Sequence, residues 1–153
     1  MAQPFPLPEP MRLALEEARA SAAADEVPIG AVVVKDGVVI ATGQNRNRRD
    51  KDPTAHAEIV AMRAAAKTLS TDRLTGCDLW VTLEPCAMCA GAIAHARIDR
   101  LYYGALDPKG GGVEHGARVF AQAQCHHRPE LFGGIGADGA AVLLRDFFAE
   151  RRS

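Results

Sequence analysis

Several features that would narrow the function of this chain are scarce or missing from its sequence. The 153 residues carry a net charge of −1, so the chain as a whole does not attract nucleic acid and any basic surface must be local. No apolar run approaches the roughly 20 residues that cross a bilayer, and we expect no membrane association. The first residues, MAQPFPLPEPMR, do not combine a basic start with an apolar core. We therefore expect no signal peptide and a cytoplasmic location.

Cysteine is also scarce, with four residues, and two of them lie three positions apart as Cys86 and Cys89. Thiols stay reduced in the cytoplasm, so this spacing indicates metal binding or catalysis in preference to a disulfide. A chain of this length can bury roughly 70% of its unfolded surface and needs no disulfide to fold. Since the sequence contains no repeat, low-complexity segment or linker, we expect a single domain over residues 1–153.

The hydrophobic pattern predicts strands that alternate with helices. Two β-branched runs in IGAVVVKDGVVIATG flank an Asp-Gly turn and predict a hairpin. The alternation along the rest of the chain predicts an α/β fold with three layers, α/β/α. Beyond the hairpin we expect helices over residues 11–24, 55–68 (capped by Thr54), 86–96, 113–122 and 137–152, and strands over 78–83, up to Gly104, and over 130–135.

Three residues from two separate segments have the donor atoms of a catalytic zinc site. His56 offers a ring nitrogen, and Cys86 and Cys89 offer two thiolates. Three protein ligands are the number that a catalytic zinc ion uses while its fourth position stays open to water. Cys86 follows Pro85 at a predicted helix start, where the helix dipole favours a thiolate. A closed structural site is the alternative and needs a fourth ligand. The candidates for it are Cys77, His95 and Cys125, although Cys77 and Cys125 are also typical of core cysteines.

Glu58 would turn such a metal site into an enzyme. A carboxylate beside an activated water can take its proton and pass it to a ring nitrogen or to a leaving amine. His56 and Glu58 are about 200° apart around an α-helix, so both can reach one centre only from a helix end. We therefore expect two helix starts that face each other. His-x-Glu followed by Pro-Cys-x-x-Cys is the signature of the zinc-dependent nucleobase deaminases.

Longer stretches extend the likeness beyond this signature. EVPIGAVVV, NRNRRDKDPTAHAEI, VTLEPCAMCAGAI and YYGALDPKGG, with LLRDFF near the C-terminus, resemble the bacterial tRNA-specific adenosine deaminases of the cytidine deaminase-like superfamily. The resemblance runs from about residue 11 to the end and is weakest between residues 110 and 136. It implies a cytidine deaminase-like fold, with a mixed five-stranded sheet and helices on both of its faces.

The resemblance also implies an activity and an assembly. The activity is hydrolytic deamination of the wobble adenosine of a tRNA anticodon loop to inosine, by attack of zinc hydroxide at C6. His56, Cys86 and Cys89 would hold one Zn²⁺ per subunit of a homodimer, and Glu58 would be the proton shuttle. A free-base or nucleotide deaminase, acting on cytosine, guanine or deoxycytidylate, is one alternative on the same zinc core. A zinc-stabilised RNA-binding module without activity is the other.

Further residues are expected to contact the substrate. The resemblance assigns Asn45 to the flipped base and Asp107 to the neighbouring nucleotides, and from the residues alone either one is equally typical of a turn. Phe147 and Phe148 are adjacent, so they cannot share one helix face. RNA loops are commonly bound by stacking on aromatic side chains. The resemblance gives this role to Phe148.

A local basic surface is expected in the loop before the zinc helix. Arg46 and Arg48 lie there with Arg49 and Lys51, where they can contact phosphates. A solvated charged face is the alternative interpretation. Small residues dominate the following helix, AMCAGAIAHA, and they would let another backbone approach closely. That backbone is either the sheet of the same chain or a partner subunit.

Overall fold

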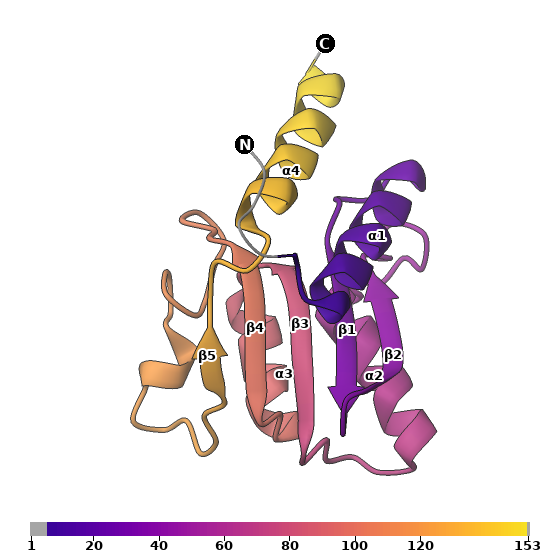
Figure 1. Cartoon of the computed structure of the whole chain (residues 1–153). Coiled ribbons are helices and arrows are strands. Elements are labelled where there is room, and N and C mark those ends of the chain that lie inside the picture. The colour runs from indigo at the N-terminus through magenta and orange to yellow at the C-terminus, as the bar shows by residue number, and fades with distance from the viewer. Residues whose placement is uncertain (1–5, 153) are drawn as a thin grey trace.

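The computed structural model describes residues 6–152, and its centre is a mixed sheet of five strands (Figure 1). The strands lie in the order β2-β1-β3-β4-β5. β1 (Gly30–Lys35) is antiparallel to both β2 (Val38–Gln44) and β3 (Cys77–Leu83). β4 (Arg100–Ala105) and β5 (Glu130–Phe132) extend the sheet in parallel with β3. The expected mixed five-stranded sheet is confirmed.

Helices cover both faces of this sheet. α1 (Glu9–Ala23) and α4 (Ala137–Arg152) lie on one face, and α2 (Ala57–Leu69) and α3 (Ala87–Ala96) lie on the other (Figure 1). Each face has its own buried hydrophobic cluster, which joins the strands to the helices above them. The three-layer α/β/α arrangement is therefore confirmed. Among the described residues, no helix is both long enough and apolar enough to span a membrane.

Small residues bring α2 unusually close to β2. A Cβ atom at Gly43 would lie 2.5 Å from the carbonyl oxygen of Ala57 and 2.6 Å from the backbone nitrogen of Ala61. Only glycine fits at this position, because both neighbours are backbone atoms. Ala57, Ala61 and Ala65 are themselves fully buried along the same side of the helix. This contact fixes the height of the first turn of α2 above the sheet.

Two predictions of local structure are wrong. The residue that caps α2 is His56 and not Thr54, whose hydroxyl and N–H donate to Oδ1 of Asp52 at 2.7 and 2.9 Å. Thr54 therefore belongs to a turn made by Asp52, which competes with helix capping. Within the described residues 113–122, the short 3₁₀ helix η1 (Val119–Ala121) is the only helical segment. The N–H groups at the start of this stretch donate to a buried carboxylate instead of to a helix.

Candidate active site

The ends of β3 and β4 and the starts of α2 and α3 meet at one end of the sheet (Figure 1). His56 is the cap residue of α2, and Cys86 is the cap residue of α3. Both have an extended backbone, so their side chains project from the helix starts and not from the helix sides. Ligands of open α/β sheets commonly bind beyond the carboxyl ends of the strands. The two expected helix starts therefore lie at the end of the sheet where ligand sites of this fold class commonly occur.

His56, Cys86 and Cys89 converge at this point. The Nδ1 atom of His56 lies 3.6 Å from Sγ of Cys86 and 3.5 Å from Sγ of Cys89. The donor atoms of the three residues all lie within 4.8 Å of one another. One imidazole and two sulfurs at these distances form a set of donors that could hold a metal ion.

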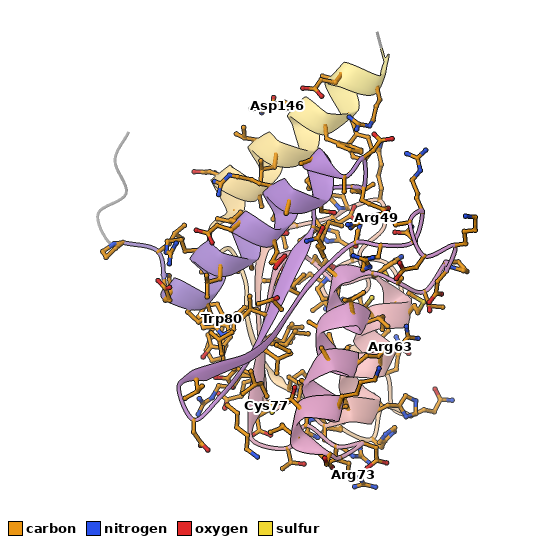
Figure 2. All side chains as sticks on the ribbon, turned by 90° about the vertical axis from the view of Figure 1, so that its right-hand side faces the viewer. Arg49, Arg63, Arg73, Cys77, Trp80 and Asp146 are labelled. Atoms are coloured by element: carbon orange, nitrogen blue, oxygen red, sulfur yellow. The ribbon has the colours of Figure 1, made fainter. Side chains whose placement is uncertain are left out.

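The candidates for a fourth protein ligand stay outside this group, as far as the described part of the chain extends. Cys77 is buried at the start of β3, at the opposite end of the sheet from the loop that carries Arg49 (Figure 2). His95 lies in the last turn of α3 and packs edge-on against another histidine, with 5.2 Å between ring centroids. The thiol of Cys125 donates to the carbonyl oxygen of His127 at 3.1 Å. The donor set therefore has three protein members.

The ionisation of the two cysteines is strongly coupled. The hydrogen bond from the Cys89 thiol lowers the pKa of Cys86 to about 4, burial opposes this change, and His56 contributes to it. The same hydrogen bond, together with burial, raises the pKa of Cys89. The hydrogen bond with Cys86 raises the pKa of His56. One thiolate is thus present at neutral pH, and a cation among the three donors would displace the proton that the pair retains.

Glu58 lies beside these donors in the first turn of α2. Its side chain is buried, and burial raises the pKa of its carboxyl group to about 7, an effect that the nearby Cys86 reinforces. A carboxyl group that titrates near neutral pH can both accept and release a proton. Together with His56 and Cys86, it lines a cavity of about 220 Å³. The other residues that line this cavity are Ile29, Leu83, Glu84, Asp107 and Gly110.

Asn45 and Asp107 have different places around this cavity. Asn45 is buried, and its Oδ1 accepts the N–H of Ala57 at 2.8 Å, so it satisfies the first turn of α2. It is not among the residues that line the cavity. Asp107 does line the cavity, while its Oδ1 accepts the N–H groups of Lys109 at 3.2 Å and Gly110 at 2.9 Å. Asn45 therefore stabilises the first turn of α2, and Asp107 stabilises a turn. Asp107 also forms part of the cavity wall.

A second cavity, of about 480 Å³, continues from the first toward α4. Phe148 lines it and is 46% exposed, whereas Phe147 is 6% exposed and packs in the interior. The two adjacent rings therefore lie on different faces of α4, as the sequence predicted. Four residues line both cavities, namely Ile29, Leu83, Asp107 and Gly110. One groove therefore leads from Glu58 to Phe148.

Carboxylates neutralise part of the expected basic surface. Nε of Arg46 lies 3.1 Å from Oδ2 of Asp50, and the guanidinium of Arg48 lies 3.2 Å from Oδ2 of Asp25. Asp25 also pairs with Arg151, which comes from α4. Neither Arg46 nor Arg48 lines the two cavities. The structure places them in the flanking loop, with 39% and 68% of their side chains exposed.

Sequence reasoning missed two buried glutamates that hold the loops on either side of the groove. Glu26 accepts the N–H of Arg48 at 3.2 Å, the N–H of Arg49 at 2.8 Å and Nε of Arg49 at 3.2 Å. Arg49 lies on the loop between β2 and α2 (Figure 2). Glu84 accepts N–H groups from the segment 107–115. The sequence signal for Glu84 is its position directly before Pro85 and Cys86, and the sequence pattern contains no signal for Glu26.

Known proteins of similar sequence and structure include deaminases. Residues 8–152 match the family model of the MafB19-like deaminases. The chain is 58% identical over 142 residues to a tRNA-specific adenosine deaminase of Agrobacterium fabrum, with 93% of each chain covered. A solved structure from work on A-to-I editing by tRNA:A34 deaminases at the wobble position of transfer RNA is 57% identical, with a TM-score of 0.87 over 88% of this chain and 98% of that one. A guanine deaminase from Nitrosomonas europaea is 29% identical, with a TM-score of 0.79 over 92% of this chain and 83% of that one.

Proposed function

The chain belongs to the family of tRNA-specific adenosine deaminases, and from this membership we propose that it converts adenosine to inosine at the wobble position of a tRNA anticodon. Relatives with these names match it over nearly all of both chains, which supports the substrate class. The observation that carries the proposal is the cluster of His56, Cys86 and Cys89 beside the buried Glu58. We propose that residues 1–153 form one deaminase domain and that it works in the cytoplasm.

We propose one Zn²⁺ per subunit, bound by His56, Cys86 and Cys89. Zinc–nitrogen bonds of about 2.05 Å and zinc–sulfur bonds of about 2.3 Å in tetrahedral geometry place the two donor atoms about 3.5 Å apart. The two nitrogen–sulfur distances here, 3.6 and 3.5 Å, fit that value. Two thiolates also balance the charge of the ion. When bound, zinc supplies an activated water at neutral pH.

Glu58 carries protons in the proposed reaction. Its carboxylate takes a proton from the attacking water and delivers it to the adenine ring nitrogen beside C6. The carboxylate then passes the remaining proton of the new C6 hydroxyl to the amine; the C6–N bond breaks as the C6 carbonyl forms, so adenosine and water yield inosine and ammonia. A carboxyl group buried beside the reacting atoms can exchange protons with both water and substrate.

The groove beyond Glu58 is the proposed site for the rest of the anticodon loop. We propose that Asp107 and Phe148 contact the nucleotides beside the target, since both line the part of the groove nearest α4. Asn45 would donate its side-chain NH₂ group to the flipped base, because its Oδ1 already binds the N–H of Ala57. Arg46 and Arg48 would exchange their carboxylate partners for phosphates of the RNA.

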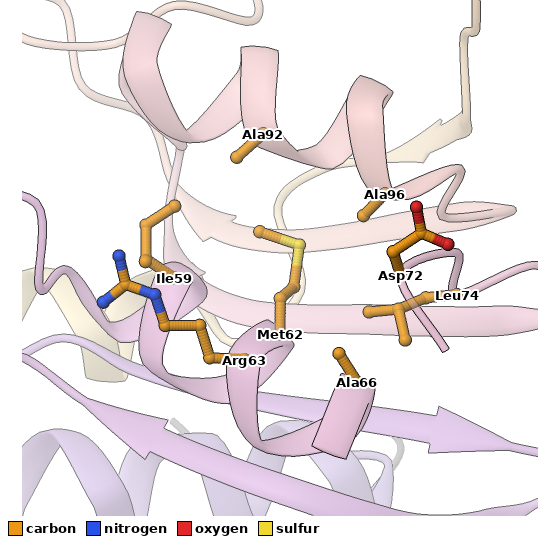
Figure 3. A pocket seen from close by; sticks show the side chains of 8 residues that line it. All are labelled: Ile59, Met62, Arg63, Ala66, Asp72, Leu74, Ala92 and Ala96. Carbon is orange, nitrogen blue, oxygen red and sulfur yellow. The ribbon is translucent and has the colours of Figure 1, made fainter. Parts of the chain in front are cut away.

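We propose that a second copy of the chain packs on α3. Met88 is 39% exposed on this helix, next to small residues. A groove of about 380 Å³ lies between α2 and α3, and Met62 extends across it toward α3 (Figure 3). A groove of about 600 Å³ lies on the other side of α3. The same apolar surface on two copies can form the self-complementary interface of a twofold dimer.

Sedimentation velocity tests this assembly. The wild-type chain should sediment as a dimer, and Met88→Asp should shift it to monomer because a carboxylate would be buried at the interface. A wild-type chain that is monomeric at micromolar concentration would contradict the proposed dimer.

Nucleoside analysis after incubation with an anticodon stem-loop tests the function. The zinc-loaded chain should form inosine and ammonia from a stem-loop with adenosine at the wobble position, whereas Glu58→Gln should keep its metal and form no inosine. Cytosine, guanine and deoxycytidylate are the competing substrates, and guanine is the natural one to compare because a guanine deaminase shares this fold. A preference for any small substrate would contradict the RNA substrate. Tight RNA binding without ammonia release would instead support a binding module.

A further inference from the structure

Glu84 is a buried carboxylate to which the proposed reaction gives no role. It follows the end of β3, and its side chain has 0% exposure. Its Oε1 accepts the N–H of Asp107 at 3.0 Å and lies 2.8 Å from Nδ1 of His115. Its Oε2 accepts three successive backbone N–H groups, from Val113 at 3.1 Å, Glu114 at 2.8 Å and His115 at 3.0 Å. Both ends of one loop are therefore bound to a single side chain.

The segment 107–115 folds around this carboxylate. A Cβ atom at Gly111 would lie 2.4 Å from Oε2 of Glu84 and 2.6 Å from the carbonyl oxygen of Asp107, so the loop touches the carboxylate with its backbone. The N–H of Gly111 donates to that same carbonyl oxygen at 2.9 Å, and the N–H of Gly112 donates to the carbonyl oxygen of Pro85 at 2.8 Å. The loop is thus joined to the turn that precedes α3 by side-chain and backbone hydrogen bonds together.

This arrangement connects two walls of the cavity that contains Glu58. Asp107 and Gly110 line the cavity from the loop, Cys86 lines it from the start of α3, and Glu84 lies between them. A buried carboxylate is stable only while its hydrogen bonds are made, so it favours one loop conformation strongly over others. We propose that Glu84 is a positioning residue, which fixes the segment 107–115 as the substrate-facing wall and thereby sets the affinity for the nucleotide beside the target. The identity of this ligand rests on the proposed function.

Two substitutions disturb the contact from its two sides. Glu84→Gln keeps the size of the side chain but replaces one acceptor oxygen with an NH₂ group. If the remaining oxygen faces the N–H groups of residues 113–115, the NH₂ group points at the N–H of Asp107 and repels it. In the other orientation it repels three N–H groups. Gly111→Ala leaves Glu84 intact and displaces the loop from it.

Two measurements on the zinc-loaded full chain, neither of which depends on turnover, report the mobility of the loop and the affinity for RNA. Amide hydrogen exchange, followed by mass spectrometry, reports on residues 107–115. Fluorescence anisotropy of a labelled anticodon stem-loop reports on binding, with every variant placed in a Glu58→Gln background so that no turnover occurs. Glu26→Gln is the matched control, because Glu26 is also a buried glutamate that holds a loop through backbone N–H groups.

In Glu84→Gln and Gly111→Ala, we expect the amides of residues 107–115 to exchange hydrogen about tenfold faster than in the wild-type chain. This is the effect of losing a hydrogen bond to a charged group. Both should bind the stem-loop about tenfold more weakly and keep their zinc, while Glu26→Gln should leave exchange in this segment unchanged. Unchanged exchange in Glu84→Gln, or equal acceleration in Glu26→Gln, would overturn the proposal. So would a loss of zinc without a change in the loop. If the wild-type chain forms no inosine, the proposed function fails, and the exchange data still judge the role of Glu84.

Discussion

A methyl group at Gly43 should move α2 away from the sheet and misplace both His56 and Glu58. The added carbon would lie 2.5 Å from the carbonyl oxygen of Ala57 and 2.6 Å from the nitrogen of Ala61. Favourable contacts between such atoms begin at about 3.5 Å. The backbone of α2 must therefore move about 1 Å away from β2. Overpacking of this kind costs about 1–3 kcal/mol of folding free energy. A displacement of about 1 Å at reacting groups can lower the rate about 100-fold.

Urea unfolding and single-turnover inosine formation by zinc-loaded Gly43→Ala measure these two effects. The matched control is Gly139→Ala on α4, where an added Cβ would meet Leu15 at an ordinary 3.8 Å. In a helix, this change from glycine to alanine should stabilise the fold by up to about 1 kcal/mol and leave turnover intact. Wild-type stability and turnover in Gly43→Ala would refute the reasoning that close packing of α2 on β2 sets the geometry of the site.

Three further substitutions have outcomes that the contacts specify. Asp25→Asn removes the ion pair that neutralises Arg48, so stem-loop affinity measured by anisotropy should rise about two- to fivefold, and a fall would show that the ion pair helps binding. Burial alone would raise the pKa of Glu26, but the N–H groups of Arg49 and Arg48 outweigh it and hold the pKa below 4.5. The stability that Glu26 adds over Glu26→Gln should therefore be present near pH 6 and shrink as the pH falls below about 4.3, whereas a gap constant with pH would exclude this linkage. Cys86→Ala should lose bound zinc and unfold at a lower temperature, and full zinc content in dialysed protein would remove Cys86 from the ligand set.

The sequence best predicted the structural features that depend on residues close together in the chain. The hairpin with its Asp36-Gly37 turn is present, and both turn residues have positive φ. The two helix starts are also present, because His56 and Cys86 are placed by their own segments. Thr54 shows the limit of such reasoning. His56 takes the cap position of α2, and the N–H of Ala57 is bound by the side chain of Asn45, which lies twelve positions before Ala57 and is brought to it only by the packed hairpin.

What the sequence did not predict depends on contacts between distant segments. Glu26 and Glu84 are charged residues, which composition alone places at the surface. They are buried because backbone N–H groups more than 20 positions away surround their carboxylates. Arg48 likewise is typical of a free basic loop, until the fold places Asp25 beside it. Pairings of this kind have no local sequence signal, since they form only when the loops are packed.

An anomalous difference map, recorded at the zinc absorption edge from crystals of the purified chain, tests the central claim most directly. We expect one peak per chain, bonded to Nδ1 of His56 and to Sγ of Cys86 and Cys89, with its fourth position open toward Glu58. A fourth protein side chain on the ion, or zinc-loaded crystals without a peak among these three residues, would contradict the account.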